Sequence, residues 1–473
     1  MNVLFVFTET LRKNNKKHRQ TPLPTEEDIP LGISYIASVL EANNHKVDLF
    51  ITTTPNDLKD FDELMETFKP DVIGCSMVYR EFFSCVKIMK HVKRKYPQVY
   101  IFAGGAHCTL NPEAVLEAGF DAACVGEGEY PVLELVEQIE RKIRPTGIQN
   151  FWFRTESGIE KNETRDYICD LDQLPFPNRR IWQKYIADKT GMHDVIVGRG
   201  CPYNCTYCCN HALRSKGKGT YVRFRNPDKV IEEIRSMREE FPDIDSIFLE
   251  TEAINLNMDF LEELAEKLNQ LNKELENPIA FGANIRLHQD IDIPQIIKLF
   301  VKGNIVVINI GLESGSERVR KEVLNRPEYI NDDLRLMVKL AKKYHRHIMI
   351  FALLGLPGET LEECRETMQV VKECHPNFVH LGIFTPYPGT VLYDRCVEDK
   401  LIVPKTYKEK GRHKAAFNTQ HMTKRQIEKE YYLFFPRVYA KTKKQFLILL
   451  IIFFLIYRFN WTFLVKYGMK YIN

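Results

Sequence analysis

Short apolar runs alternate with amphipathic stretches through the first 145 residues of the chain. The apolar runs have the length of strands and lie at 2–7, 46–50, 71–76, 99–103 and 122–125. Helical patterns lie at 31–42, 57–68, 81–95, 112–118 and 129–142. Strands that alternate with helices are typical of crossover units, so this part predicts a parallel sheet covered by helices on both faces.

A hairpin and a linker follow this alternation. Residues 151–168 form two short runs around Glu156-Ser157-Gly158, which predicts a turn. The next segment, Leu174-Pro175-Phe176-Pro177-Asn178, contains two prolines, which exclude a helix and favour an extended chain. We expect the boundary between two domains here.

A second strand–helix series begins near residue 194. Its expected strands lie at 194–198, 246–250, 279–283, 306–311, 347–354 and 378–384, and its clearest helices at 227–240, 259–271 and 361–374. A closed barrel of this type has eight units. Six units therefore predict an open, partial barrel.

The expected organisation is α/β throughout. A doubly wound, flavodoxin- or Rossmann-like parallel sheet domain occupies 1–145, and a hairpin and linker occupy 146–190. A partial (β/α)6 barrel of the TIM type covers 191–395, and a helical C-terminal region covers 396–473.

The C-terminal region contains an apolar segment at 446–457. Lys441, Lys443 and Lys444 precede it and Arg458 follows it. As a helix it is ~18 Å long, against ~30 Å of membrane hydrocarbon, so we expect it not to span a bilayer. Two interpretations stay open: a terminal helix buried on the barrel, or a helix on the surface of a membrane.

The composition narrows the class of protein. The chain has 473 residues, of which 44% are hydrophobic and 27% charged, and these values exclude disorder. Its 66 basic and 63 acidic side chains give a net charge of only +3, so we expect no nucleic-acid partner. The first ten residues contain Glu9 and no basic lead, unlike a signal peptide. Twelve cysteines then indicate a reducing compartment, and we expect a cytoplasmic protein with possible membrane association through the apolar segment.

The sharpest chemical feature is a C-x3-C-x2-C run made by Cys201, Cys205 and Cys208. Three thiolates on one loop suit zinc or an iron–sulfur cluster. On a four-iron cluster, three ligands would leave one iron open to a further ligand. The spacing leaves zinc open as well, with His211 as its fourth ligand. Cys209 adjoins Cys208, and we expect its side chain to point elsewhere.

The segment from Gly200 to Cys208 resembles the cluster loop of radical S-adenosylmethionine (SAM) enzymes. Further motifs of that family lie at the ends of later strands: Gly311-Leu312-Glu313-Ser314-Gly315-Ser316, Gly355-Leu356-Pro357-Gly358-Glu359-Thr360 and Thr385-Pro386-Tyr387-Pro388-Gly389-Thr390. The N-terminal part is similar to the subgroup whose radical domain follows a cobalamin-binding domain. The segments that carry this likeness are Pro30–Ala37, Gly104–His107 and Val125–Glu129. The resemblance covers roughly residues 1–425.

This resemblance implies three cofactors: a [4Fe-4S] cluster on Cys201, Cys205 and Cys208, SAM on the open iron, and cobalamin. It implies SAM contacts from Glu250, Glu252, Arg286, Glu313 and Ser314. It implies cobalamin contacts from Gly32, Gly104, Gly105, His107, Gly126 and Glu127. One electron from the cluster would cleave SAM and release a 5′-deoxyadenosyl radical.

The implied SAM roles differ from residue to residue. Glu313 would hydrogen-bond ribose hydroxyls, and Arg286 would meet the SAM carboxylate with two hydrogen bonds. The alternatives are a helix-terminal acid for Glu313 and a solvated charge for Arg286. Glu250 and Glu252 stand where the subgroup often has paired aspartates, which weakens their assignment to the SAM ammonium group.

The cobalamin assignment also has an alternative. None of the 13 histidines has Asp two residues before it, so the D-x-H-x-x-G motif that supplies cobalt with a histidine is missing. Cobalamin would therefore bind without a histidine from that motif. A flavodoxin-like domain that has lost its cofactor is the alternative.

The implied function is methyl transfer to an unactivated carbon or phosphorus centre of a small-molecule or natural-product substrate. A flavodoxin or ferredoxin would supply electrons. Ring formation or oxidative rearrangement on the same architecture is the alternative, and a non-catalytic zinc-binding module is the competing class. Modification of tRNA, known in other radical SAM groups, fits poorly with the balanced charge. The sequence assigns no catalytic side chain.

Overall fold

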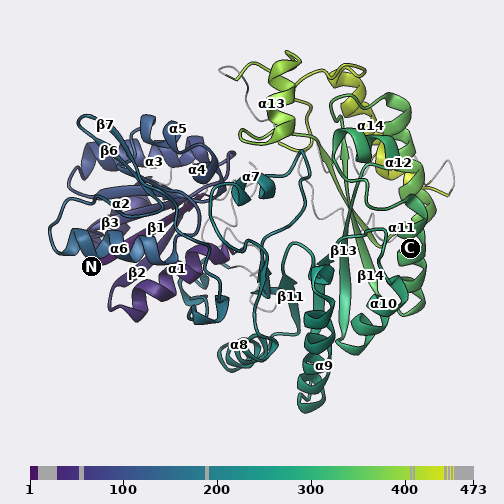
Figure 1. The fold of residues 1–473 in the computed structure, drawn as a ribbon, viewed down its shortest axis with the longest axis horizontal. Coiled ribbons are helices and arrows are strands. Elements are labelled where there is room, and N and C mark those ends of the chain that lie inside the picture. Colours follow the sequence, from purple (N-terminus) through teal and green to yellow (C-terminus); the bar gives the residue numbers. More distant parts are fainter. Residues whose placement is uncertain are drawn as a thin grey trace. The chain divides into compact units, whose positions relative to one another are not determined.

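The computed structural model describes residues 1–8, 29–52, 58–186, 191–404, 407, 411–441, 445, 448 and 451. The chain divides into two compact units (Figure 1). The first contains Met1–Tyr203 and Cys209–Glu250, and the second contains Asn204–Cys208 and Thr251–Asn473. The four domain ranges expected from the sequence stay predictions.

The first unit is built on a seven-stranded sheet in the order β2-β1-β3-β4-β5-β6-β7. Its strands are β1 (Asn2–Thr8), β2 (Lys46–Thr52), β3 (Val72–Ser76), β4 (Tyr100–Gly104), β5 (Ala122–Cys124), β6 (Phe151–Thr155) and β7 (Gly158–Lys161). Strands β1 to β5 are parallel, which confirms the predicted parallel sheet. The order 2-1-3-4-5 is that of flavodoxin-like folds, in which ligands lie beyond the carboxyl ends of the strands.

The hairpin predicted after residue 150 extends this sheet. β6 pairs antiparallel with β5 through Phe151 and Cys124, and β7 pairs antiparallel with β6. The turn between them lies at Glu156-Ser157, as the sequence predicts.

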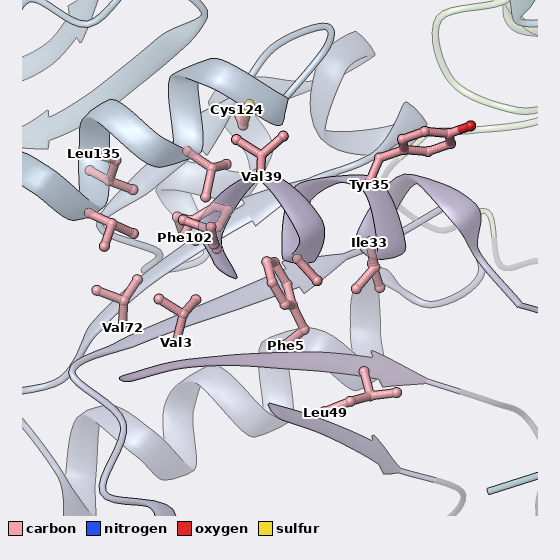
Figure 2. Close-up of a cluster of buried hydrophobic side chains, with 14 of the residues drawn as sticks. Val3, Phe5, Ile33, Tyr35, Val39, Leu49, Val72, Phe102, Cys124 and Leu135 are labelled. Atoms are coloured by element: carbon pink, nitrogen blue, oxygen red, sulfur yellow. The ribbon is translucent and has the colours of Figure 1, made fainter. Parts of the chain in front are cut away.

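Helices cover both faces of the sheet. They are α1 (Leu31–Ala42), α2 (Leu58–Phe68), α3 (Phe82–Lys95), α4 (Ala106–Leu110), α5 (Pro112–Glu117) and α6 (Glu129–Glu140). Alternate residues of β1 point to opposite faces, so Val3 and Phe5 join one core and Leu4 and Val6 join the other. Figure 2 shows the first core, in which Val39 of α1 and Leu135 of α6 pack with Phe5 and Phe102.

The first unit also contains the start of the second series. β8 (His193–Ile196) pairs in parallel with β11 (Ser246–Glu250), and β9 (Gly198–Arg199) pairs antiparallel with β10 (Arg223–Phe224). The helix α7 (Asn210–Arg214) lies between β9 and β10 in the chain, and the helix α8 (Pro227–Glu240) lies between β10 and β11. The helix α8 begins where Asn226 accepts a hydrogen bond from the Asp228 N–H and Pro227 takes the first helical position.

The second unit contains four parallel strands in the order β15-β14-β13-β12. Their bounds are β12 (Ala280–Ile285), β13 (Ile305–Glu313), β14 (His347–Leu354) and β15 (Phe378–Ile383). Its helices are α9 (Met258–Glu274), α10 (Ile293–Lys302), α11 (Asn331–Lys343), α12 (Leu361–Cys374), α13 (Val391–Glu398) and α14 (Lys424–Tyr439). The second strand–helix series thus has the six strands that the sequence predicts, of which β8 and β11 belong to the first unit and these four to the second.

The apolar segment predicted at 446–457 lies outside the described residues, positions 448 and 451 aside. Its two interpretations therefore stay predictions. In the part of the chain that the structure describes, no helix is long and apolar enough to cross a membrane.

Candidate cluster and cofactor site

The cysteine loop starts from a constrained backbone in the first unit. Gly200 has φ +91°, and a Cβ at this position would come within 2.1 Å of the Tyr221 carbonyl oxygen. Only glycine fits such a position without a shift of the backbone. Cys201 follows directly, and Arg214 of α7 donates from Nη1 to its carbonyl oxygen at 3.3 Å.

The rest of the loop belongs to the second unit. The Thr206 N–H donates to the Leu324 carbonyl at 3.1 Å, and the Thr206 hydroxyl donates to the Val323 carbonyl at 2.6 Å. Cys205 is buried, and its sulfur accepts a hydrogen bond from Arg286 Nη1 at 3.1 Å. Arg286 thus places a positive charge beside a sulfur that could ligate a metal.

The donor set of the loop fits a soft metal centre. Three cysteines lie within eight residues, and none of the twelve cysteines, all of which belong to the described residues, forms a disulfide. Among the described residues, no three or more His, Cys, Asp or Glu side chains converge as a formed metal site, either with or without His211. The fit therefore rests on the sulfur chemistry and on the charge that Arg286 places at Cys205.

Arg286 lies beside this loop and pairs with the carboxylate of Glu328, whereas the sequence analysis predicted a pair with the carboxylate of SAM. Its Nη2 donates to both carboxylate oxygens of Glu328 at 2.9 Å. The side chain is 8% exposed, so a solvated surface charge is the wrong interpretation. The prediction that Arg286 meets the carboxylate of SAM stays a prediction, because the chain's own Glu328 now occupies that nitrogen.

Glu313 lies at the same loop in a strained conformation. It has φ +63° at the end of β13, where few side chains of this kind occur. Its carboxylate is 3.5 Å from Arg326 Nη1 and hydrogen-bonds to Tyr207 of the cysteine loop. Burial raises the pKa of this carboxyl, while Arg326 and Tyr207 act in the opposite direction. A carboxylate held in this way has acceptor capacity for a further hydrogen-bond donor.

Two residues of this region were missed by the sequence reasoning. Arg326 donates to the Tyr207 hydroxyl at 2.9 Å and to the Gly311 carbonyl at 2.8 Å. Gly311 leaves the space for this group, since a Cβ there would lie 2.6 Å from Glu313 Oε1. Tyr207 was visible inside the cysteine motif, whereas Arg326 belongs to no motif and only its fold places it here.

The other expected SAM contacts lie apart from this cluster of side chains or are buried. Ser314 is fully buried, and its hydroxyl lies 3.4 Å from that of Thr367 on α12. Glu250 is half-buried at the end of β11 in the first unit, and Glu252 is exposed in the second. Their roles toward SAM stay predictions.

The expected cobalamin contacts follow strand ends of the first unit. Gly104 ends β4, and Gly105 has φ +90° with its Cβ direction 2.7 Å from the Met77 carbonyl oxygen, so a side chain is excluded there. A Cβ on Gly126 would lie 3.1 Å from Asn150 Nδ2. Gly32 is exposed on α1, with nothing within 4 Å of an added Cβ.

His107 is the polar side chain of this edge that is best placed to meet a cofactor. It is 5% exposed and lies between the rings of Tyr79 and Phe82, with centroids 5.3 and 4.8 Å away. Asn111 Nδ2 lies 3.3 Å from Nδ1, whereas Nε2 is buried without a hydrogen-bond partner among the described residues. Burial lowers the pKa of His107 to about 4, so the ring is neutral at pH 7. With Nδ1 accepting from Asn111, the proton lies on Nε2, which makes Nε2 a donor.

Glu127 has its oxygens occupied by protein groups. They accept from Arg199 Nη1 at 3.0 Å, from Arg223 at 2.9 and 3.0 Å, and from the Ile168 N–H at 2.8 Å. Burial would raise its pKa, but the two arginines hold the pKa below its ordinary value. Its expected contact with cobalamin stays a prediction, and these four bonds compete with it.

Comparison with known protein families agrees with both halves of this arrangement. Residues 26–136 match the B12 binding domain, and residues 195–371 match the Radical SAM superfamily. The chain is a radical SAM protein with an N-terminal B12-binding domain. These matches confirm the predicted family. They also confirm the cofactors that the two domains imply, which are cobalamin for the B12-binding domain and SAM with a [4Fe-4S] cluster for the radical SAM domain. The competing zinc-binding module is disfavoured by the same match.

Curated relatives of this radical SAM protein are distant. An "uncharacterized methyltransferase" of Pyrococcus horikoshii is 26% identical over 408 residues, which are 85% of either chain. The anaerobic magnesium-protoporphyrin IX monomethyl ester cyclase of Rubrivivax gelatinosus is 24% identical over 77% of this chain and 65% of its own. The cytidylyl-2-hydroxyethylphosphonate methyltransferase of Streptomyces wedmorensis is 24% identical over 80% of this chain and 81% of its own.

A solved structure supports the fold. The radical S-adenosylmethionine methyltransferase TsrM from Kitasatospora setae matches with a TM-score of 0.68 at 17% identity, over 90% of this chain and 84% of that one. At this identity the likeness concerns the fold alone.

Proposed function

We propose that this enzyme transfers a methyl group to an unactivated carbon or phosphorus centre of a small-molecule substrate. The observation that carries the proposal is the placement of Arg286, Glu313 and Arg326 around the Cys205–Cys208 part of the cysteine loop. A zwitterionic amino acid with a ribose needs a cation for its carboxylate and an acceptor for its hydroxyls, and this loop has both. The relatives named methyltransferases support the type of reaction.

In this proposal the residues of the chain have distinct roles. Cys201, Cys205 and Cys208 hold the cluster, Arg286 binds the carboxylate of SAM, and Glu313 accepts hydrogen bonds from ribose hydroxyls. When bound, the cluster supplies the electron that cleaves SAM and cobalamin supplies the methyl group. Glu250, Glu252 and Ser314 remain proposed SAM contacts with weaker support.

The overall reaction balances with two molecules of SAM and two electrons. They convert R–H into R–CH3 and release S-adenosylhomocysteine, methionine and 5′-deoxyadenosine. The hydrogen removed from the substrate is the third methyl hydrogen of 5′-deoxyadenosine. A flavodoxin or ferredoxin is the proposed source of the electrons.

The test is anaerobic reconstitution of the full chain with iron, sulfide, cobalamin, SAM and a reductant, followed by mass spectrometry. The proposal requires SAM cleavage and both S-adenosylhomocysteine and 5′-deoxyadenosine when substrate is present. Substrate candidates are taken as pools of small metabolites, and the methylated product appears as a mass increase of one CH2. Stoichiometric zinc without iron after reconstitution contradicts the proposal.

Ring formation or rearrangement is the second candidate, because one relative is named a cyclase. The same experiment separates the two. A cyclase produces 5′-deoxyadenosine and methionine without S-adenosylhomocysteine, since no methyl group leaves SAM.

A further inference from the structure

A buried ion-pair cluster joins the loop after β5 to the strand that leads into Cys201. It consists of Glu127, Glu129, Arg199 and Arg223, all in the first unit. Arg199 donates from Nη1 to Glu127 at 3.0 Å and from Nη2 to Glu129 at 2.7 Å. Arg223 donates to both oxygens of Glu127 at 2.9 and 3.0 Å. The two acids and two bases balance in charge.

The pairing of β9 with β10 explains why this ion-pair cluster forms. Arg199 and Arg223 are direct partners in the β9–β10 ladder, so their two positive charges face each other. Glu127 lies between them and accepts from both. The exposed fractions of the four side chains are only 4 to 18%. Charged hydrogen bonds in such surroundings fix geometry closely, because any displacement leaves a desolvated charge unpaired.

Arg199 is close enough in the chain to constrain the backbone of the first cysteine, Cys201. Only Gly200 separates Arg199 from Cys201, and this glycine is packed against the Tyr221 carbonyl with no room for a side chain. On the other side, Arg214 donates to the Cys201 carbonyl, and Tyr167 donates to the Arg214 carbonyl at 3.1 Å. Cys201 is therefore held from both sides of the loop.

The other end of the cluster lies at the ligand edge of the B12-binding sheet. Glu127 lies in the short loop between β5 and α6, Glu129 is the first residue of α6, and the Gly126 N–H donates to Thr109 of α4 at 3.1 Å. The helix α4 also carries His107. The same short loop thus contacts the edge where the cobalamin is expected and the strand before the first cluster cysteine.

We propose that Glu127 and Glu129 are positioning residues that act through Arg199 to set the geometry of Cys201. In this role Glu127 connects the ligand edge of the B12-binding sheet to the cysteine loop and does not contact cobalamin. The inference rests on the proposed function insofar as it needs the cluster on Cys201 and the cobalamin in the first unit.

The test uses the full-length protein, reconstituted anaerobically with cluster and cobalamin. The double variant E129Q/R199Q removes the ion pair between Glu129 and Arg199, and with it the connection to Cys201. It leaves the Glu127–Arg223 ion pair intact, so the remaining charges are balanced. The control is E134Q/R165Q, which removes a more exposed Glu–Arg ion pair of the same helix α6, with bonds of 3.0 and 3.1 Å. Readouts are iron content, the electron paramagnetic resonance (EPR) spectrum and midpoint potential of the reduced cluster, retained corrinoid and melting temperature.

We expect E129Q/R199Q to retain corrinoid and to show a cluster spectrum and potential that differ from those of both the wild type and the control. Should this variant fail to fold, R199K replaces it, because lysine keeps the charge but cannot reach both carboxylates; the same spectral change is expected. A wild-type spectrum and potential in these variants overturn the inference. So does an E127Q variant that loses corrinoid while its cluster is unchanged. If the wild type itself binds no cluster, it is the proposed function that fails.

Discussion

Two clusters of buried charged side chains lie at the two parts of the cysteine loop, and they differ in how completely their charges are paired and hydrogen-bonded. The first, made by Glu127, Glu129, Arg199 and Arg223, has balanced charge and hydrogen bonds of 2.7 to 3.0 Å. The second, around Glu313 and Arg326, has a carboxylate 3.5 Å from its cation, a raised carboxyl pKa and a backbone at φ +63°.

The difference indicates what each cluster does. Groups whose hydrogen bonds are complete hold structure, whereas strain and an incompletely paired charge are typical of sites that await a ligand. We therefore infer that the first cluster positions the loop and the second binds SAM. The predictions below test this division, beginning with the largest expected effect.

Removal of one sulfur has the largest expected effect. Cys205→Ala deletes the thiol to which Arg286 donates, and we expect loss of the cluster and of all SAM cleavage. Cys201→Ala and Cys208→Ala have the same expected result. Cys209→Ala is the matched control and keeps about four irons per chain. Iron analysis and SAM cleavage measure the outcome, and an iron-free Cys209→Ala protein would show that the ligands are wrongly assigned.

The second cluster is tested through its carboxylate. Glu313→Gln removes the charge that we propose accepts hydrogen bonds from the ribose hydroxyls, and we expect SAM affinity to fall by ~10-fold or more, which is ~1.4 kcal/mol. Ser314→Ala changes the adjacent buried position, whose hydroxyl lies 3.4 Å from that of Thr367, and we expect it to lower SAM affinity less than Glu313→Gln and to lower thermal stability. Equilibrium binding of SAM to the reconstituted protein gives both values. Equal losses in the two variants would remove the distinction.

His107 tests the ligand edge of the first unit. His107→Phe keeps a ring between Tyr79 and Phe82 but removes the Nε2 donor, so we expect cobalamin affinity to fall by ~5-fold, about 1 kcal/mol. Because the proton lies on Nε2, the EPR spectrum of bound cob(II)alamin should show no histidine nitrogen. Nitrogen splitting that disappears in the variant would contradict the donor role.

The same histidine predicts a pH dependence. Its pKa is lowered from 6.5 to about 4 by burial, so between these values the unfolded chain binds more protons than the folded one. The contribution of the neutral ring to stability is complete above pH 6.5 and is lost as the pH falls toward 4. Denaturant unfolding of wild type and His107→Phe across this range should show a shallower acid decline in the variant.

The smallest effects are expected at two acids of the Gly355–Thr360 motif and the following helix. Burial raises the pKa of Glu359 from 4.5 to about 8, so its protonated form contributes stability that is complete below pH 4.5 and is lost as the pH rises through 8. Glu359→Gln should therefore gain stability relative to wild type, by ~1 kcal/mol or more, as the pH increases from 5 to 8.

Glu363 supplies the opposite slope. Burial raises its pKa, but hydrogen bonds from Arg318 and from the Thr360 N–H outweigh burial and lower the pKa to about 2. Its contribution is present above pH 4.5 and lost as the pH falls toward 2, so Glu363→Gln should be destabilised at pH 7 and approach wild type in acid. Two curves with the same slope would contradict these assignments.

The sequence by itself predicted the alternation of strands and helices, the parallel sheets and, through its resemblance to radical SAM enzymes, the cysteine loop. The helices expected at 31–42, 227–240 and 361–374 occur with those bounds, because apolar periodicity, caps and prolines act within a few residues. The motif Gly311–Ser316 indicated Glu313 through its resemblance to the radical SAM family, which a short strand-end loop is able to carry because it is a local feature.

Only the tertiary structure decided which charges meet. Arg199 pairs with Glu127 over 72 residues and Arg223 pairs with Glu127 over 96, and no periodicity encodes such a separation. It also placed Ser314 against α12, and Arg286 against Cys205 and Glu328. An ion pair depends on two side chains whose elements are brought together by packing elsewhere. The pattern along the chain therefore predicts where a charged residue sits in its strand or loop, whereas its partner depends on the whole core.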